Sequence, residues 1–374
     1  MSKNSSGKLQ LAVICGGKSS EHEVSLVSAQ NILRAVDQER YELHLLAITR
    51  QGAWRLYNDV FHFTDHSDNP DLISLREDDF ESVLFEMQPD HAQLRVADGR
   101  ILHFDVVFPI MHGSFAEDGK MQGLLEMFSW PYVGPDVLGS ALAMDKAVTK
   151  NLVRQAGIKI ADFIEVTQAN RQEWSYEAAA ARLGETIFVK PANAGSSVGI
   201  SKTTNQAAYN QALAQAFRFD RKVLLEQAIV GRELECSVFG NADALQAGEV
   251  GEVVPSSKYG FYSYDAKYLD ADGAALYVPA MLTASERELV RQTAVQVMAV
   301  CQCEGMARVD FFLSATGDLY LNEINTIPGF TNISMYPKLM MAETGWTYGE
   351  LVDRLLQLAI ARQQRNAALI ISKK

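Results

Sequence analysis

The chain has 374 residues, of which 48% are hydrophobic and 21% are charged. This length and composition predict a globular protein of two or three domains, each with enough apolar material for a core. The formal net charge of −12 gives the chain no general attraction for polyphosphate backbones, so we expect no nucleic-acid partner.

We also expect no membrane partner, because no stretch reaches the roughly 18 apolar residues that span a bilayer. The apolar run after the polar start MSKNSSGK is too short for the core of a signal peptide. The cysteines do not have the spacing of a zinc site. The composition therefore indicates a cytoplasmic protein with buried, reduced thiols.

The first third of the chain alternates strand-like and helix-like segments. Residues 9–15 and 42–48 are apolar runs typical of strands, and residues 21–36 have the pattern of an amphipathic helix. Residues 103–113 predict a further strand that runs into a loop. This βαβ order predicts a parallel sheet with ligands at the carboxyl ends of its strands.

The segment ICGGKSSEHEVSL resembles a phosphate-binding loop but does not match one. A Walker A loop needs a glycine where the chain has Ala12. A dinucleotide fingerprint needs another glycine beyond Gly16 and Gly17. We therefore expect no phosphate here and place Lys18 on the surface.

Two carboxylates stand at the start of the helix that follows. Ser20 and Glu23 have the spacing of a capping box, which predicts that the helix begins near Glu21. Carboxylates at the positive end of the helix dipole would repel a phosphate. We expect Glu23 only to cap the helix, whereas Glu21 either caps it or receives an ammonium group.

The later segments mix helices, strands and one long irregular stretch. Helices are expected over residues 141–158, 284–303 and about 346–363. Gly157 is the expected C-cap of the first of these helices, and two strands surround Gly231 within residues 222–240. Residues 256–277, rich in tyrosine and glycine, fit neither pattern and are expected to form a functional loop such as a lid.

A second glycine-rich segment is the better candidate for holding phosphates. Residues 186–202 predict a strand, a loop and a second strand, and Lys190 ends the first strand. The loop NAGSSVG offers successive backbone N–H groups and two hydroxyls that can wrap a polyphosphate. Downstream, Glu226 and Glu233 lie in strand-like runs and either hold an adenine and a ribose or are ordinary surface carboxylates.

The segment 306–325 predicts a hairpin with polar side chains on one face. Because strand side chains alternate, Arg308 and Asp310 share a face, and so do Glu323 and Asn325. If the two faces coincide, oxygen ligands suited to Mg²⁺ meet beside a guanidinium. The alternative is a polar hairpin surface that faces solvent.

Taken in chain order, these segments resemble the D-alanine–D-alanine ligase family of ATP-grasp enzymes. The resemblance covers nearly the whole chain and is carried by GGKSSEHEVSL, HGSFAEDGKMQGLLE, YVGPDVLGSALAMDK, VKPANAGSSVGISK, GRELECSV, YDAKY, ARVDFF and LNEINTIPGFTNISMYP. One departure is Ala116, where the family commonly has glycine. This departure concerns loop geometry and not chemistry.

The resemblance implies the ATP-grasp fold, an α/β and α+β architecture of three parts. These parts are an N-terminal parallel α/β substrate-binding domain (1–113), a central ATP-grasp subdomain (114–231) and a C-terminal one (232–374) with an omega loop at about 256–277. It implies a reaction in which ATP phosphorylates the carboxylate of one D-alanine. The amine of a second D-alanine then attacks the acyl phosphate, for peptidoglycan precursor synthesis. A homodimer is implied as well.

The resemblance also assigns the nucleotide and its metal ions to particular residues. The ATP residues would be Lys146, Lys190, Ser196, Ser197, Glu226, Ala228, Glu233, Phe261, Lys267, Asn322 and Glu323. Two Mg²⁺ ions, with Mn²⁺ as a substitute, would be held by Asp310, Glu323 and Asn325. Arg308 and the Gly329 backbone N–H would form an oxyanion hole.

The amino-acid substrates are assigned in the same way. Glu21 would bind the first ammonium in a hydrogen-bonded set with Ser196 and Tyr262, and His112 would lie beside the first carboxylate. Ser334 and the Met335 backbone would receive the second carboxylate, with Lys267 and Tyr268 nearby. The base that takes the proton of the second amine is not identified.

Tyr268 bears on specificity, because related D-alanine–D-lactate ligases differ in the omega loop. A tyrosine at this place favours an amine nucleophile over a hydroxy acid. The D-lactate enzyme and a glutathione-type ligase are the alternatives within the fold. A Rossmann-type oxidoreductase and an inactive nucleotide-binding module are the alternatives outside it.

Overall fold

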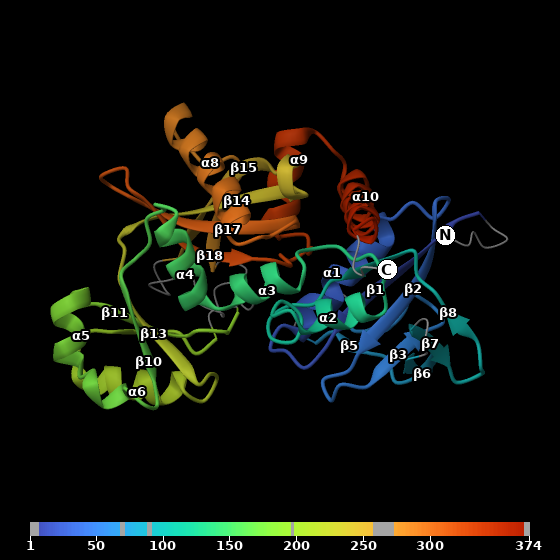
Figure 1. Cartoon of the computed structure of the whole chain (residues 1–374), viewed down its shortest axis with the longest axis horizontal. Coiled ribbons are helices and arrows are strands. Elements are labelled where there is room, and N and C mark those ends of the chain that lie inside the picture. The colour runs from blue at the N-terminus through green and yellow to red at the C-terminus, as the bar shows by residue number, and fades with distance from the viewer. Residues whose placement is uncertain (1–6, 68–71, 88–91, 196–197, 257–272, 370–374) are drawn as a thin grey trace.

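The computed structural model describes residues 7–67, 72–87, 92–195, 198–256 and 273–369. Within these ranges, three large sheets of seven, four and five strands follow one another along the chain. In Figure 1 the seven-stranded sheet lies at the right, the four-stranded sheet at the lower left and the five-stranded sheet above. No helix in the described ranges is long and apolar enough to cross a membrane.

The first sheet has the order β8-β7-β6-β3-β2-β1-β9. Its strands are β1 (Leu9–Gly16), β2 (Tyr41–Ile48), β3 (Trp54–Tyr57), β6 (Phe80–Met87), β7 (Ala92–Val96), β8 (Ile101–Leu102) and β9 (Val106–Pro109). Strand β1 pairs in parallel with β2 and β9, as predicted, but β3, β6, β7 and β8 are antiparallel additions. The predicted parallel arrangement is confirmed for β1, β2 and β9, whereas direct connections without a crossover helix join β2 to β3 and β6 to β7 to β8, which makes these pairs antiparallel. A separate ribbon pairs β4 (Thr64–Asp65) with β5 (Ser74–Leu75).

Helices from both ends of the chain cover this sheet. Helix α1 (His22–Ala35) and the final helix α10 (Tyr348–Ala367) bury apolar faces in one core with β1, β2 and β9. The predicted capping box does not form, because Glu21 rather than Ser20 is the N-cap and gives no side-chain cap bond. Glu23 instead pairs with Arg50 across the loop.

The segment predicted as one helix over residues 141–158 is two helices. Helix α2 (Lys120–Met127) leads into α3 (Val137–Met144), and α4 (Lys146–Gln155) follows after a break at Asp145. The break arises because the Asp145 carboxylate accepts the backbone N–H groups of Ala147 and Val148, which starts a new helix. Gly157 follows the end of α4 with a positive φ of 82°, as expected for a residue that ends a helix.

The second sheet is antiparallel and has the order β10-β13-β11-β12. Its strands are β10 (Phe163–Thr167), β11 (Ile187–Pro191), β12 (Ser201–Thr203) and β13 (Lys222–Gln227), and helices α5 (Tyr176–Leu183) and α6 (Gln206–Ala216) complete its core. The predicted strand, loop and strand over residues 186–202 are confirmed as β11 and β12.

The third sheet has the order β16-β15-β14-β17-β18. Its strands are β14 (Gly231–Gly240), β15 (Gln246–Pro255), β16 (Ala274–Tyr277), β17 (Gly305–Ser314) and β18 (Leu319–Asn325), and helices α8 (Ala284–Val300) and α9 (Met335–Thr344) lie over it. The predicted loop over residues 256–277 is too long, because 274–277 pair with β15 as an edge strand. The predicted domain boundaries at 113 and 231 stay predictions.

Candidate functional site

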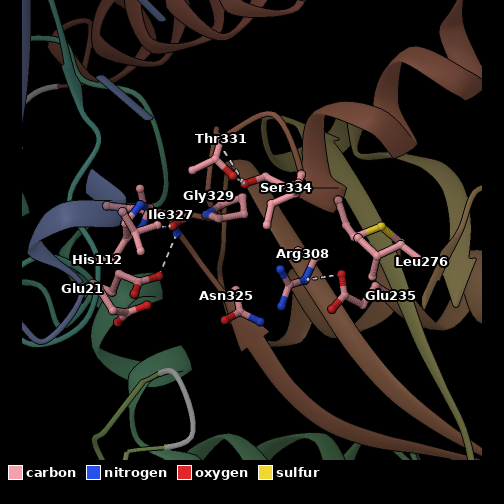
Figure 2. Close-up of a pocket in the computed structure, with 15 residues that line it drawn as sticks. Glu21, His112, Glu235, Leu276, Arg308, Asn325, Ile327, Gly329, Thr331 and Ser334 are labelled. Carbon is pink, nitrogen blue, oxygen red and sulfur yellow. Dashed lines mark hydrogen bonds and ion pairs between the residues drawn. The ribbon is translucent and has the colours of Figure 1, made fainter. Parts of the chain in front are cut away.

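Two neighbouring pockets lie where the three sheets meet. The sheet pocket, of about 360 Å³, lies between the second and third sheets and is lined by residues of β11, β13, β14, β17 and β18, among them Lys190, Glu226 and Asp310. The loop pocket, of about 100 Å³, is lined by residues of loops and of β14, β16, β17 and β18, with Glu21, His112, Glu117, Gly329 and Ser334 among its loop and helix-start residues. Figure 2 shows the loop pocket. Glu235 lines both pockets.

A buried charge cluster forms one wall of the sheet pocket. The Glu226 carboxylate on β13 is 2% exposed and receives the ammonium of Lys190 from β11 and that of Lys150 from α4, the latter at 2.8 Å. Burial by itself would raise the pKa of Glu226, but the two lysines outweigh it and lower the pKa to about 2. The carboxylate is therefore ionised in the folded protein at neutral pH.

Lys146 joins the glycine loop to the hairpin beside this cluster. Its ammonium donates to the Ala194 carbonyl at 2.8 Å and lies 3.4 Å from a Glu323 oxygen. Lys146 is the first residue of α4, whose start Asp145 fixes. The predicted nucleotide residues Lys190, Glu226, Ala228, Glu233, Asn322 and Glu323 all line the sheet pocket.

The hairpin faces coincide, as the metal-site interpretation required. Arg308 is paired with Asn325 and Asp310 with Glu323 in the ladder between β17 and β18. Arg308 donates to both oxygens of Asp310, at 2.8 and 2.7 Å, and Asn325 Nδ2 donates to Asp310 Oδ2 at 2.9 Å. The alternative of a solvent-facing hairpin surface is wrong, because Asp310 is only 8% exposed and lines a pocket.

A second carboxylate holds Arg308 from the neighbouring strand. Glu235 on β14 lies 3.0 Å from Arg308 Nε (Figure 2). Although burial would lower the pKa of Arg308, Asp310 and Glu235 raise it well above its ordinary value. The guanidinium is thus permanently charged and fixed between the two pockets.

The donor set of the hairpin fits a hard divalent cation better than a transition metal. Asp310 and Glu323 offer carboxylate oxygens, and Asn325 offers an amide oxygen that its contact with Asp310 does not use. No group of three or more His, Cys, Asp or Glu suitable for a metal occurs among the described residues. Two carboxylates and an amide suit Mg²⁺, which keeps further oxygen ligands from phosphates and water.

Glu21 lines the loop pocket and lies in the turn after β1 of the first sheet. It is the N-cap of α1 and is 7% exposed. A Cβ added at either Gly113 or Gly195 would lie 3.0 Å from Glu21 Oε2, so the carboxylate packs against two glycines from different parts of the chain. The predicted ammonium-binding residue therefore lies directly beside the predicted phosphate loop.

His112 and Glu117 both contact the loop after β18. His112 Nδ1 lies 2.9 Å from the Ile327 carbonyl, which fixes that nitrogen as the N–H donor and leaves Nε2 unprotonated. Burial lowers the pKa of His112, so the ring is neutral. Glu117 accepts the Gly113 N–H at 2.7 Å and the Ile327 N–H at 3.0 Å. Burial and the nearby Glu21 raise the pKa of Glu117 to about 7.

The far side of the loop pocket is the start of α9. Ser334 is the N-cap of this helix, and its Oγ accepts the Thr331 N–H at 2.9 Å (Figure 2). Met335 is the first helical residue, so the backbone N–H groups of the first turn point to this side. Such a helix start favours a carboxylate. A Cβ added at Gly329 would lie 2.7 Å from Ser334 Oγ, so a larger residue there would displace the serine hydroxyl.

The GGKS segment does not form a phosphate site. The Gly16 N–H donates to Ser25 Oγ at 2.7 Å, and the Gly17 N–H donates to the Ile48 carbonyl at 2.7 Å. These backbone donors are therefore occupied within the first sheet and α1. Lys18 is exposed, which confirms its predicted place on the surface.

Some predicted site residues lie outside the described ranges, namely Ser196, Ser197, Phe261, Tyr262, Lys267 and Tyr268.

Sequence reasoning missed Lys150, Glu117 and Glu235. Lys150 is four residues after Lys146 on one helix face, which was a usable signal. Glu117 and Glu235 gave none, because Glu117 accepts the N–H of the distant Ile327 and Glu235 pairs with Arg308 on another strand. Ala116 is fully buried, and Gln122 donates to its carbonyl at 2.7 Å.

The family models and the similar proteins of known name agree on one family. Residues 10–135 match the family described as D-ala D-ala ligase N-terminus, and residues 152–357 match D-ala D-ala ligase C-terminus. D-alanine--D-alanine ligase A from Salmonella typhimurium is 47% identical over 97% of this chain and 98% of its own length. D-alanine--D-alanine ligase from Shouchella clausii is 45% identical, with 97% of both chains covered.

Solved structures give the same picture of the fold. The D-alanine-D-alanine ligase from Coxiella burnetii has a TM-score of 0.81 at 34% identity and covers 96% of this chain and 97% of its own. The VanG D-Ala:D-Ser ligase from Enterococcus faecalis has a TM-score of 0.82 at 33% identity and covers 94% and 99%.

Proposed function

The chain belongs to the D-alanine–D-alanine ligase family, and from this membership we propose that it joins two D-alanines into D-alanyl-D-alanine at the expense of ATP. The observation that supports this reaction is the Arg308–Asp310 pair, which links the two pockets because Arg308 lines the loop pocket and Asp310 lines the sheet pocket. One pocket suits a nucleotide and the other suits small zwitterions. The pair between them lies where a phosphoryl group would pass from one to the other.

We propose that ATP occupies the sheet pocket. Ala228 and Glu226 lie beside the adenine, and Glu233 lies near the ribose. Lys146 and Lys190 neutralise phosphate charge, together with the loop after β11. Asp310, Glu323 and Asn325 would hold Mg²⁺, with Mn²⁺ as a substitute, which neutralises the charge that develops on the transferred phosphoryl group.

The first D-alanine lies in the loop pocket in this proposal. Its ammonium is bound by the buried Glu21 carboxylate, and its own carboxylate points toward the sheet pocket and receives the γ-phosphoryl group of ATP. The products of this step are a D-alanyl phosphate and ADP. His112 lies beside the first D-alanine, and because its ring is neutral it adds no positive charge that would repel the substrate ammonium.

The second D-alanine binds with its carboxylate at Ser334 and the first turn of α9. Its amine attacks the acyl phosphate, and the tetrahedral oxyanion is stabilised by Arg308 and the Gly329 N–H. One such donor contributes about 3 kcal/mol to the barrier reduction. Collapse of the intermediate releases phosphate and forms the peptide bond.

We further propose a cytoplasmic homodimer that supplies a peptidoglycan precursor. A D-alanine–D-lactate ligase of the same fold is the alternative. The curated relatives that match nearly the full chain do not favour it. Tyr268, on which the choice of nucleophile was predicted to depend, lies outside the described residues.

The test is phosphate release from ATP with D-alanine, compared with L-alanine and with D-alanine plus D-lactate across pH. We expect release with D-alanine, no release with L-alanine, and a dipeptide as the product by mass spectrometry. Release that requires D-lactate, with an ester as the product, would show that the nucleophile has been assigned wrongly.

A further inference from the structure

The loop that carries Gly329 is bound on both sides by residues of the N-terminal half of the chain. On one side, the Ile327 N–H donates to Glu117 and the Ile327 carbonyl lies 2.9 Å from His112 Nδ1. On the other side, the Phe330 N–H donates to Ser28 Oγ at 3.1 Å. Gly329 therefore lies between two peptides whose positions are set by other elements.

Glu117 is the acidic member of this arrangement. One of its oxygens accepts the Gly113 N–H at 2.7 Å and the other accepts the Ile327 N–H at 3.0 Å. The two donors belong to the loop after β9 and the loop after β18, which are more than two hundred residues apart in sequence. A carboxylate that accepts one N–H from each loop fixes the distance between them.

The two loops carry groups that must act on the same molecule. The loop after β9 carries His112 and packs Gly113 against Glu21, where the first ammonium is proposed to bind. The loop after β18 carries Gly329. The Glu117 carboxylate therefore links the element that holds the substrate to the element that stabilises its oxyanion.

We propose that Glu117 is a positioning residue that holds the Gly329 N–H in register with the first D-alanine. This inference rests on the proposed ligase function. A donor displaced by about 1 Å from its place in the transition state can cost about 100-fold in rate, because its contribution depends on its position. Glu117 needs no contact with either substrate for this role.

Glu117→Gln is the direct test. The amide keeps the shape of the side chain but replaces one acceptor oxygen with an N–H₂ group, which opposes one of the two backbone donors. We expect kcat to fall about 10- to 100-fold, while KM for ATP changes less than about twofold. A dipeptide analogue with a tetrahedral phosphinate, which mimics the oxyanion, should lose affinity by a similar factor. D-alanine affinity should change little.

The affinity for the phosphinate analogue distinguishes a positioning role from general structural damage. General damage would lower the affinities for D-alanine, ATP and the analogue together. Unchanged analogue affinity in Glu117→Gln, or an unchanged kcat, would overturn the proposal. If wild-type protein shows no D-alanine-dependent phosphate release, the ligase function itself fails, which is a different result.

A second variant covers the case in which Glu117→Gln does not fold. Ser28→Ala removes the acceptor of the Phe330 N–H on the other side of Gly329, and we expect a smaller loss of kcat, with analogue affinity falling by a similarly smaller factor. Glu77→Gln is the matched control, because Glu77 is an exposed carboxylate that pairs with Arg55 at 2.7 Å away from both pockets. It should leave all of these values unchanged.

Discussion

The sheet pocket and the loop pocket hold their functional groups in different ways. In the sheet pocket, buried side chains of opposite charge fix one another, as Lys150 and Lys190 do with Glu226. In the loop pocket, side chains fix backbone groups, as Glu117 and His112 do with Ile327. Placed charges suffice to attract a polyphosphate. A single N–H that must face one oxyanion depends on the position of the backbone itself.

The largest effect should come from removing the negative charge of a proposed metal ligand. In Glu323→Gln, we expect the D-alanine-dependent release of ADP to fall below detection, a loss of at least about 100-fold, because an uncharged amide binds Mg²⁺ poorly. Circular dichroism should show an intact fold. Turnover near that of the wild type would contradict the assignment of Glu323 as a metal ligand. It would also contradict the proposed difference between the two pockets.

A large effect on stability should come from Glu226→Gln. The variant leaves two ammonium groups beside a neutral amide in a buried site, so we expect a loss of about 3–5 kcal/mol in the free energy of unfolding. Lys150→Met should cost less, because Lys190 still neutralises Glu226. Urea denaturation measures both. Equal losses of unfolding free energy in the two variants would mean that the cluster does not stabilise the fold through its charges.

The same cluster gives a pH dependence with a definite sign. The pKa of Glu226 is lowered to about 2 in the folded protein. Its stabilising contribution is therefore complete above the unfolded value of about 4.3 and is lost as the pH falls toward 2. The difference in unfolding free energy between wild type and Glu226→Gln should narrow below about pH 4. A constant difference between pH 7 and pH 3 would contradict the lowered pKa.

A smaller and more selective effect is expected from Ser334→Ala. Loss of one hydroxyl at the start of α9 should raise KM for the second D-alanine about fivefold, corresponding to about 1 kcal/mol. KM for ATP should stay the same, because Ser334 lines only the loop pocket. Steady-state kinetics with varied D-alanine and varied ATP separate the two constants. An equal rise in both would show that the pockets are not independent.

The smallest effect should come from Lys18→Ala in the GGKS segment. Lys18 is exposed, and the neighbouring glycine N–H groups are already bonded within the fold. We expect a change in stability of less than about 0.5 kcal/mol and no change in ATP affinity by calorimetry. A tenfold weaker binding of ATP by the variant would show that this segment does bind the phosphates.

Sequence reasoning succeeded where local pattern and chemistry agree. The alternation of polar residues along β17 and β18 predicted the shared face of Arg308, Asp310, Glu323 and Asn325, which the strand register confirms. The failed spacing at Ala12 predicted that GGKS would not hold phosphate. In both cases the prediction rests on residues of one short segment or one hairpin.

The failures have a common physical origin in long-range contacts. The antiparallel additions to the first sheet depend on pairing that no local pattern specifies. Helix α1 has no capping box because Glu21 rather than Ser20 is its N-cap, and Glu23 pairs with Arg50 from the loop after β2. Glu117 could not be found because its role depends on Ile327, which lies 210 residues away in sequence.

Asp310 has a consequence for how such a protein could acquire a new amino-acid substrate. Its carboxylate faces the sheet pocket and also holds Arg308, which lines the loop pocket. A substitution at Asp310 therefore alters both binding reactions at once, and selection on one substrate would disturb the other. Leu276 and Ile333 line the loop pocket alone, so inherited changes in substrate preference are expected to begin at positions of that kind.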